Sequence, residues 1–148
     1  MKIIIGSDHG GYDLKNVIKE HLKEKGVEIV DVGTVSLVSC DYPDIAKALT
    51  KKVLEENVKG ILVCGTGIGM SIAANKYDGI RAALCSDTFS ARMTREHNDS
   101  NVLCLGERVL GKGLALDIVD IWLETPFSEG ERHKHRIELI DKIEKERA

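Results

Sequence analysis

Residues 60–75 read Gly-Ile-Leu-Val-Cys-Gly-Thr-Gly-Ile-Gly-Met-Ser-Ile-Ala-Ala-Asn, and the interpretation of the whole chain starts from this stretch. The apolar run at 60–63 is typical of a strand buried on both faces, and residues 71–75 are expected to begin a helix. Between them, alternate glycines allow a sharp turn and leave backbone N–H groups unshielded by side chains. A loop of this kind at a helix N-terminus favours the binding of an anion.

Cys64 stands at the end of the expected strand, at the mouth of this loop. The positive end of a helix dipole favours the thiolate form of a nearby cysteine, so Cys64 is a candidate base beside a candidate oxyanion hole. The alternative is structural: such a turn also lets a helix pack closely on a sheet, and cysteine is often a small buried hydrophobe. The loop is not a dinucleotide fingerprint, which needs glycine in place of Met70, and it lacks the Gly-Lys-Ser/Thr of a Walker A loop.

The composition is that of an ordinary globular protein and argues against several classes of function. With 148 residues, 43 % of them apolar and 30 % charged, the chain suits a single domain over residues 1–148. A net charge of −3 offers no basic surface for nucleic acid. No apolar run approaches the ~18–20 residues that cross a membrane, and the first residues turn polar too early for a signal peptide.

The cysteines and histidines show neither a disulfide framework nor a metal signature. The four cysteines have no C-x-x-C spacing, so we expect reduced thiols and a cytoplasmic protein. His133 and His135 are two residues apart on an expected helix, so they diverge and make poor joint ligands. We therefore expect no metal site.

Expected strands and helices alternate along the whole chain. Strands are predicted at residues 2–6, 27–32, 60–63, 80–85 and 101–105. Helices are predicted to begin near residues 14, 43, 71, 87 and 114, and a last, charged helix is predicted over 131–147. This alternation predicts an α/β fold: a three-layer, doubly wound, Rossmann-like domain with a five-stranded parallel sheet and a C-terminal helix.

Polar residues are expected beyond the carboxyl ends of three strands, where sheets of this kind bind ligands. The three clusters, which one ligand could touch together, are Asp8-His9, Cys64–Thr66 and Glu107-Arg108. Asp8 also has a structural interpretation as a helix cap, with His9 merely solvated.

Two further polar groups lie on expected helices. His97 and Asn98 end one helix, where a histidine often only complements the helix dipole. Arg132 and Arg136 are four residues apart, so they share one face of the last helix. Two guanidinium groups on one face make a good phosphate clamp, although a solvated charged face is the default interpretation.

Taken together, the motifs of the chain resemble the type B ribose-5-phosphate isomerases and their relatives, the allose-6-phosphate and galactose-6-phosphate isomerases. The motifs are Gly6-Ser7-Asp8-His9-Gly10-Gly11, Asp41-Tyr42-Pro43, Cys64-Gly65-Thr66-Gly67-Ile68-Gly69, Arg95-Glu96-His97-Asn98, Gly106-Glu107-Arg108 and the pair Arg132 and Arg136. The resemblance covers essentially the whole chain. It implies an enzyme of the pentose phosphate pathway that interconverts ribose 5-phosphate and ribulose 5-phosphate without a redox cofactor.

The resemblance also implies roles for individual residues. Cys64 would move a proton between C2 and C1, and the enediolate would be stabilised by the loop amides of Gly65, Gly67, Ile68 and Gly69. The groups expected to open the sugar ring and handle hydroxyl protons are Asp8, Thr66 and His97. The groups expected to grip the phosphate are His9, Arg108, Arg132 and Arg136, and Asn98 is expected to contact substrate oxygens.

Two further implications concern the branch of the family and the assembly. In another branch a glutamate four positions after the place of Cys64 is the base; here that position is Ile68, so the chain resembles the cysteine branch. Family members form symmetric dimers whose sites borrow residues from both subunits. We therefore expect a homodimer or a dimer of dimers with shared sites.

Two alternatives stay open at this point. The substrate could be a six-carbon sugar phosphate, as in an allose-6-phosphate isomerase or a galactose-6-phosphate isomerase subunit. The chain could also be a non-catalytic module that binds a sugar phosphate or nucleotide. Against the module stands the expectation that Cys64, Asp8 and His97 surround one opening, which binding alone does not need.

Overall fold

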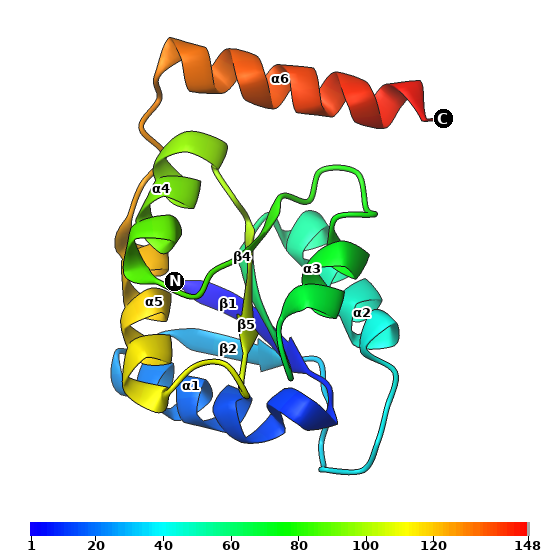
Figure 1. The fold of residues 1–148 in the computed structure, drawn as a ribbon, viewed down its shortest axis with the longest axis vertical. Helices are drawn as coiled ribbons and strands as arrows, with labels where there is room; N and C mark the ends of the chain where they lie inside the picture. The colour runs from blue at the N-terminus through cyan, green and yellow to red at the C-terminus, as the bar shows by residue number, and fades with distance from the viewer. Residues whose placement is uncertain (148) are drawn as a thin grey trace.

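The computed structural model describes residues 1–147, which fold around a central five-stranded sheet (Figure 1). The strands lie in the order β2-β1-β3-β5-β4, and every neighbouring pair is parallel. Their bounds are β1 Lys2–Ser7, β2 Glu28–Asp31, β3 Lys59–Cys64, β4 Ala82–Leu84 and β5 Val102–Gly106. The predicted doubly wound α/β fold is confirmed, with β1, β3 and β5 adjacent at the centre of the sheet.

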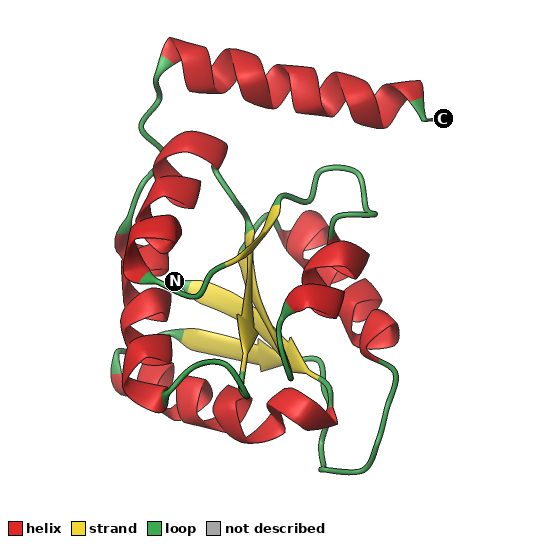
Figure 2. Cartoon of the chain, viewed as in Figure 1, coloured by secondary structure: helices red, strands yellow, loops and turns green. Residues whose placement is uncertain are grey.

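Helices cover both faces of the sheet and make the outer layers of the fold (Figure 2). Apolar side chains of α1, α4 and α5 pack on one face, and those of α2 and α3 pack on the other. The bounds are α1 Tyr12–Glu24, α2 Tyr42–Glu56, α3 Ile68–Ala74, α4 Thr88–Asn98, α5 Lys112–Glu124 and α6 Glu131–Glu146, with a 3-10 turn at His9–Gly11.

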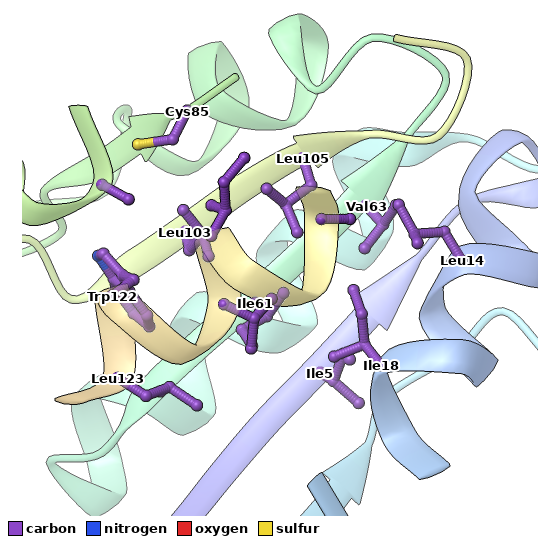
Figure 3. Close-up of a cluster of buried hydrophobic side chains, with 14 of the residues drawn as sticks. Ile5, Leu14, Ile18, Ile61, Val63, Cys85, Leu103, Leu105, Trp122 and Leu123 are labelled. Carbon is purple, nitrogen blue, oxygen red and sulfur yellow. The ribbon is translucent and has the colours of Figure 1, made fainter. Parts of the chain in front are cut away.

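Side chains of the buried strands alternate between these two layers, as the pleat of a strand requires. On β1, Ile3 and Ile5 belong to the cluster below α1 and α5, whereas Ile4 belongs to the cluster below α2 and α3. Figure 3 shows the first cluster, in which Ile61 of β3 lies near Trp122 of α5. Burial of each such side chain contributes about 1.5–3 kcal/mol, so the two clusters hold the sheet and its helices together.

The strand β4 is shorter than the run at 80–85 that the sequence predicts. The backbone N–H of Arg81 donates to Asn101 Oδ1 (2.8 Å), and that of Ala82 donates to Asn75 Oδ1 (2.8 Å). These donors are satisfied by side chains instead of by a neighbouring strand, so regular pairing begins only at Ala82.

The helix α6 lies apart from the other helices and has no buried residue (Figure 1). Near its C-terminal end, the Glu144 carboxylate accepts hydrogen bonds from the N–H of Gly79 (3.0 and 3.1 Å). Large apolar side chains of α6 are exposed, namely Leu139, Ile140 and Ile143. Within residues 1–147, no helix combines the length and apolar character needed to span a bilayer.

Candidate active site

Three loops meet at the carboxyl ends of the central strands. The backbone N–H of Asp8 donates to the Val63 carbonyl (3.2 Å), and that of Glu107 donates to the Cys64 carbonyl (2.9 Å). The N–H of Arg108 donates to the Gly65 carbonyl at 3.0 Å. The expectation that the clusters after β1, β3 and β5 lie together is therefore confirmed.

Cys64, the candidate base, lies at the centre of this arrangement. Its side chain is buried, with the residue 5 % exposed, and its Sγ accepts a hydrogen bond from the N–H of Gly67 at 3.0 Å. Gly67 has φ +78°, and a Cβ at this position would lie 2.6 Å from Leu84 Cδ1, so only glycine fits without displacement. The loop thus aims a backbone N–H at the sulfur, an interaction that is stronger for a thiolate than for a thiol.

The glycine loop is shorter than the sequence suggests. The expected helix start at residue 71 is wrong, because α3 already begins at Ile68, directly after the left-handed turn at Gly67. Ile68 and Gly69 therefore lie in the first helical turn, where backbone N–H groups have no partner within the helix. The hydroxyl of Thr66 accepts one of these, the N–H of Ile68, at 3.3 Å.

Asp8 acts as a helix cap, as its structural interpretation predicts. Its Oδ1 accepts a hydrogen bond from the N–H of Gly10 at 2.9 Å and caps the 3-10 turn. Among the described residues no hydrogen bond to Oδ2 is found, so this oxygen is open to a ligand. The neighbouring His9 accepts the N–H of Cys40 at Nδ1 (3.3 Å), so its Nε2 is the ring nitrogen left for a ligand.

The two residues of the cluster after β5 have different surroundings. Glu107 Oε1 accepts the N–H of Leu14 at 2.6 Å and so fixes the start of α1. The side chain of Arg108 lies over the glycine loop: a Cβ on Gly65 would be 3.4 Å from its Nη1. The cation of Arg108 therefore lies at the glycine loop, whereas the carboxylate of Glu107 points to the start of α1. Among residues 1–147 no group of His, Cys, Asp and Glu is arranged to hold a metal ion.

His97 and Asn98 lie at the opposite edge of the sheet. The helix of a βαβ unit runs back against the strands, so the end of α4 returns to their amino ends. The carbonyl of Asn98 accepts a hydrogen bond from Arg81 Nε (2.8 Å), just before β4. Since β3 has six residues, its two ends are about 16 Å apart. The expectation that His97 surrounds the same opening as Cys64 and Asp8 is therefore wrong for a single chain.

Arg132 and Arg136 belong to the group around His97. Both are exposed on the first half of α6, and His133 between them stacks on His97 with ring centroids 4.3 Å apart. Burial lowers the pKa of His133, and the charges of His97 and Arg136 lower it further. One chain thus carries two groups of candidate site residues, called half-sites below, one around Cys64 and one around His97, at opposite edges of its sheet.

Two residues near the Cys64 group were not singled out from the sequence as site residues. The ring of Tyr42 covers Gly69, where a Cβ would lie 2.7 Å from the ring Cζ. Lys15 is buried on α1 beside the loop that follows β2. Its spacing offered a signal, because Lys15, Ile18 and Leu22 follow the helical period and so share one face.

The other buried cysteines have a different environment from Cys64. Burial raises the pKa of Cys85 to about 11, with a smaller contribution from Asp87. Burial likewise raises the pKa of Cys104 far above its ordinary value. Both thiols stay protonated at neutral pH, so neither is a candidate base.

Comparisons with known proteins show the family of the chain. A family model described as Ribose/Galactose Isomerase matches residues 3–140. A putative sugar phosphate isomerase of Bacillus subtilis is 54 % identical over 146 residues, which is 97 % of either chain. Ribose-5-phosphate isomerase B of Escherichia coli is 51 % identical over 147 residues, 99 % of this chain and 98 % of the relative.

Solved structures extend the similarity to three dimensions. Ribose-5-phosphate isomerase B of Clostridium thermocellum has a TM-score of 0.98 at 54 % identity and covers 100 % of both chains. The enzyme of Mycoplasma genitalium, solved with bound ribulose-5-phosphate, has a TM-score of 0.93 at 42 % identity over 98 % of this chain and 97 % of its own. With sequence and fold matched over nearly its full length, the chain belongs to the ribose/galactose isomerase family.

Proposed function

We propose that this protein interconverts ribose 5-phosphate and ribulose 5-phosphate. The observation that carries the proposal is the Cys64 thiol, held under the N–H of Gly67 (3.0 Å) and next to the loops that bear Asp8 and Arg108. The Escherichia coli relative is named for this activity. The Mycoplasma genitalium relative was solved with the ketose, ribulose-5-phosphate, bound. An aldose and its ketose are isomers, so proton transfer alone balances the reaction.

The proposed mechanism uses Cys64 as the base. The thiolate takes the proton from C2 of the open-chain aldose, the electron pair forms the C1–C2 double bond of an enediolate, and the proton returns at C1. Backbone amides of Gly65, Gly67, Ile68 and Gly69 stabilise the negative oxygen that develops between these steps. The proton that must move between the two sugar oxygens is assigned to Asp8, Thr66 and His97, which would also open the ring.

The phosphate would be held by cations from both half-sites. His9 and Arg108 lie beside the glycine loop, and His9 keeps Nε2 available because Cys40 occupies Nδ1. Arg132 and Arg136 carry the remaining positive charge, and Asn98 would contact substrate oxygens. A charge-assisted hydrogen bond contributes about 1.5–3 kcal/mol, so each arginine that reaches the phosphate should matter for binding.

We further propose that a symmetric homodimer joins the two half-sites. About 16 Å of strand separates the groups of Cys64 and His97 in one chain, so a partner subunit must supply the second group. Apolar side chains suited to such an interface are exposed on α3, β4, α4 and α6, including Ile72, Leu84, Phe89 and Ile143. A cleft of about 470 Å³ between α6 and the amino edge of the sheet could receive side chains of a second copy.

A panel of substrates tests the proposed activity. The purified chain is assayed on five- and six-carbon aldose phosphates, and we expect the fastest turnover on ribose 5-phosphate. Binding without turnover of any sugar phosphate would instead identify a binding module, and a clear preference for a six-carbon substrate would identify the other branch of the family.

The shared site is tested by mixing two impaired variants. Cys64→Ser damages one half-site and Arg136→Ala the other, so a mixed dimer has one intact site. Random reassortment should therefore restore about a quarter of wild-type activity at low substrate. Activity equal to the average of the two separate variants would show that each chain builds its own site.

The cytoplasm is the compartment that we propose for this reaction. All four cysteines are free thiols, among them the proposed base, and a reducing compartment keeps them in that state.

A further inference from the structure

Lys15 is a buried cation beside the proposed active site. The residue is only 1 % exposed, and its Nζ donates to Asp31 Oδ1 (3.1 Å) and to the carbonyl of Thr34. The ammonium also lies 5.3 Å from the ring centroid of Tyr12. A charge is kept in such a place only when its partners replace water, and loss of one partner is costly. The surroundings of Lys15 are therefore built to hold it in one position.

These contacts fix the beginning of the connection between β2 and α2. Asp31 Oδ1, which accepts from Lys15, also accepts the N–H of Gly33 at 2.8 Å. Gly33 and Thr34 in turn exchange backbone hydrogen bonds with Ser7, at 2.6 and 2.5 Å. Ser7 directly precedes Asp8. A chain of hydrogen bonds therefore connects the pair of Lys15 and Asp31 to the loop that carries Asp8 and His9.

The other end of the same connection reaches His9. The N–H of Cys40 donates to His9 Nδ1 at 3.3 Å, which requires that this nitrogen carry no proton. Between the two ends, the side chains of Val35, Leu37 and Val38 are exposed and make no core contact. The course of residues 34–40 therefore depends on its anchored ends, and Lys15 holds one of them.

We propose that Lys15 is a positioning residue for His9, acting through the connection at residues 33–40. Lys15 holds Thr34, the anchored connection delivers the N–H of Cys40 to Nδ1, and the proton of the neutral imidazole is thereby kept on Nε2. His9 then presents a donor to the ligand. The effect of Lys15 on turnover rests on the proposed function, whereas its effect on the His9 ring does not.

The charge pair itself supports this role. Burial would raise the pKa of Asp31, but hydrogen bonds from Lys19, the Gly33 N–H and Lys15 outweigh it and hold that pKa below its ordinary value. The carboxylate thus remains charged, and remains a partner for Lys15, throughout the neutral range.

Lys19 provides a matched control on the same helix. It pairs with the same carboxylate, with 2.8 Å between its Nζ and Asp31 Oδ2, but its side chain is 23 % exposed. Unlike Lys15, it is within hydrogen-bond distance of no backbone atom of the connection among the described residues. Lys15→Met and Lys19→Met therefore remove the same charge near the same partner, and only the first releases Thr34.

The test measures which ring nitrogen of His9 carries the proton. The chain has five histidines, and His9→Gln assigns the His9 signals in nitrogen-detected NMR spectra of protein labelled with ¹⁵N-histidine. We expect the Nε2–H tautomer of His9 in the wild type and in Lys19→Met, and a mixture of tautomers in Lys15→Met. In the assay on ribose 5-phosphate, Lys15→Met should raise KM about tenfold or more with a smaller change in kcat, and Lys19→Met should stay within about twofold of wild type.

Two results would overturn the inference. One is a wild-type spectrum in which His9 carries its neutral proton on Nδ1, which needs no variant to fold. The other is a Lys15→Met protein whose His9 signals and KM equal those of Lys19→Met. If Lys15→Met does not fold, Asp31→Asn takes its place, because it removes the anion that holds both Lys15 and the Gly33 N–H. A wild-type protein without isomerase activity would contradict the proposed function and leave the NMR test of Lys15 intact.

Discussion

Replacement of Cys64 by serine tests the proposed chemistry with little change of shape. A serine Oγ can accept the hydrogen bond from Gly67, as the sulfur does at 3.0 Å, in a site that is 5 % exposed. The free energy of unfolding should therefore change by no more than about 1 kcal/mol. A hydroxyl holds its proton far more tightly than a thiol at neutral pH, so it cannot replace the base. We expect kcat to fall at least about a thousandfold, which corresponds to ~4 kcal/mol of barrier.

Cys104→Ser is the matched control, and the opposite outcome is expected. Cys104 lies on the adjacent strand, level with Leu62, and its side chain points to the same face of the sheet as that of Cys64. It is fully buried among apolar side chains, so a serine hydroxyl there would lack a partner. The cost should be about 1–3 kcal/mol of stability, with kcat unchanged.

The assay combines initial rates on ribose 5-phosphate with urea unfolding of both variants and binding of the substrate to Cys64→Ser. Alkylation should inactivate the wild type, and bound substrate should slow the inactivation. If Cys64→Ser turned over at a near-normal rate, the carbon-bound proton would have to move through another group such as Asp8, and the assignment of the base would be wrong.

Three other outcomes are expected. Arg136→Ala should raise KM or lower kcat/KM by about tenfold to a hundredfold, with an unchanged melting temperature. Lys142→Ala, on the same exposed helix, should change neither the kinetics nor the melting temperature. Wild-type kinetics in Arg136→Ala would show that Arg136 does not bind the phosphate. Because burial raises the pKa of Cys85 to about 11 from 9.0, the folded state keeps a proton that the unfolded state releases at alkaline pH. Between pH 8 and pH 10 the wild type should therefore lose about 1 kcal/mol more stability than Cys85→Ala in urea unfolding, and parallel losses would contradict the shifted pKa. In sedimentation at assay concentration the protein should be a dimer or a larger assembly of dimers, and a fully active monomer would refute the shared site.

Much of the fold was predictable because its signals are local. Apolar runs at 60–63 and 101–105, separated by segments of helical period, predict buried parallel strands whatever their order in the sheet. Glycines in the run 65–69 likewise predict a tight loop, since the backbone conformation they permit is a property of the residue. The meeting of the clusters at Asp8, Cys64 and Arg108 also followed, because parallel strands end at one edge.

Some errors came from contacts that are distant in sequence. The beginning of β4 is set by the side chains of Asn75 and Asn101, which accept the backbone N–H groups of Ala82 and Arg81. Glu107 was expected in the site, but its carboxylate caps the N–H of Leu14, 93 residues away in the chain. Neither partner is visible in the local pattern of apolar and polar residues.

By itself, then, the sequence determined the layers, the parallel sheet and the tight glycine loop that follows Cys64. Only the tertiary structure decided that His97 lies at the opposite edge, because the helix α4 must run back along the strand it follows before the next strand can begin. It also decided that Lys15 is a buried charge, because burial depends on the packing of α1 against the connection after β2. Residue type and spacing specify what a side chain can do, whereas the direction of each element specifies which side chains can do it together.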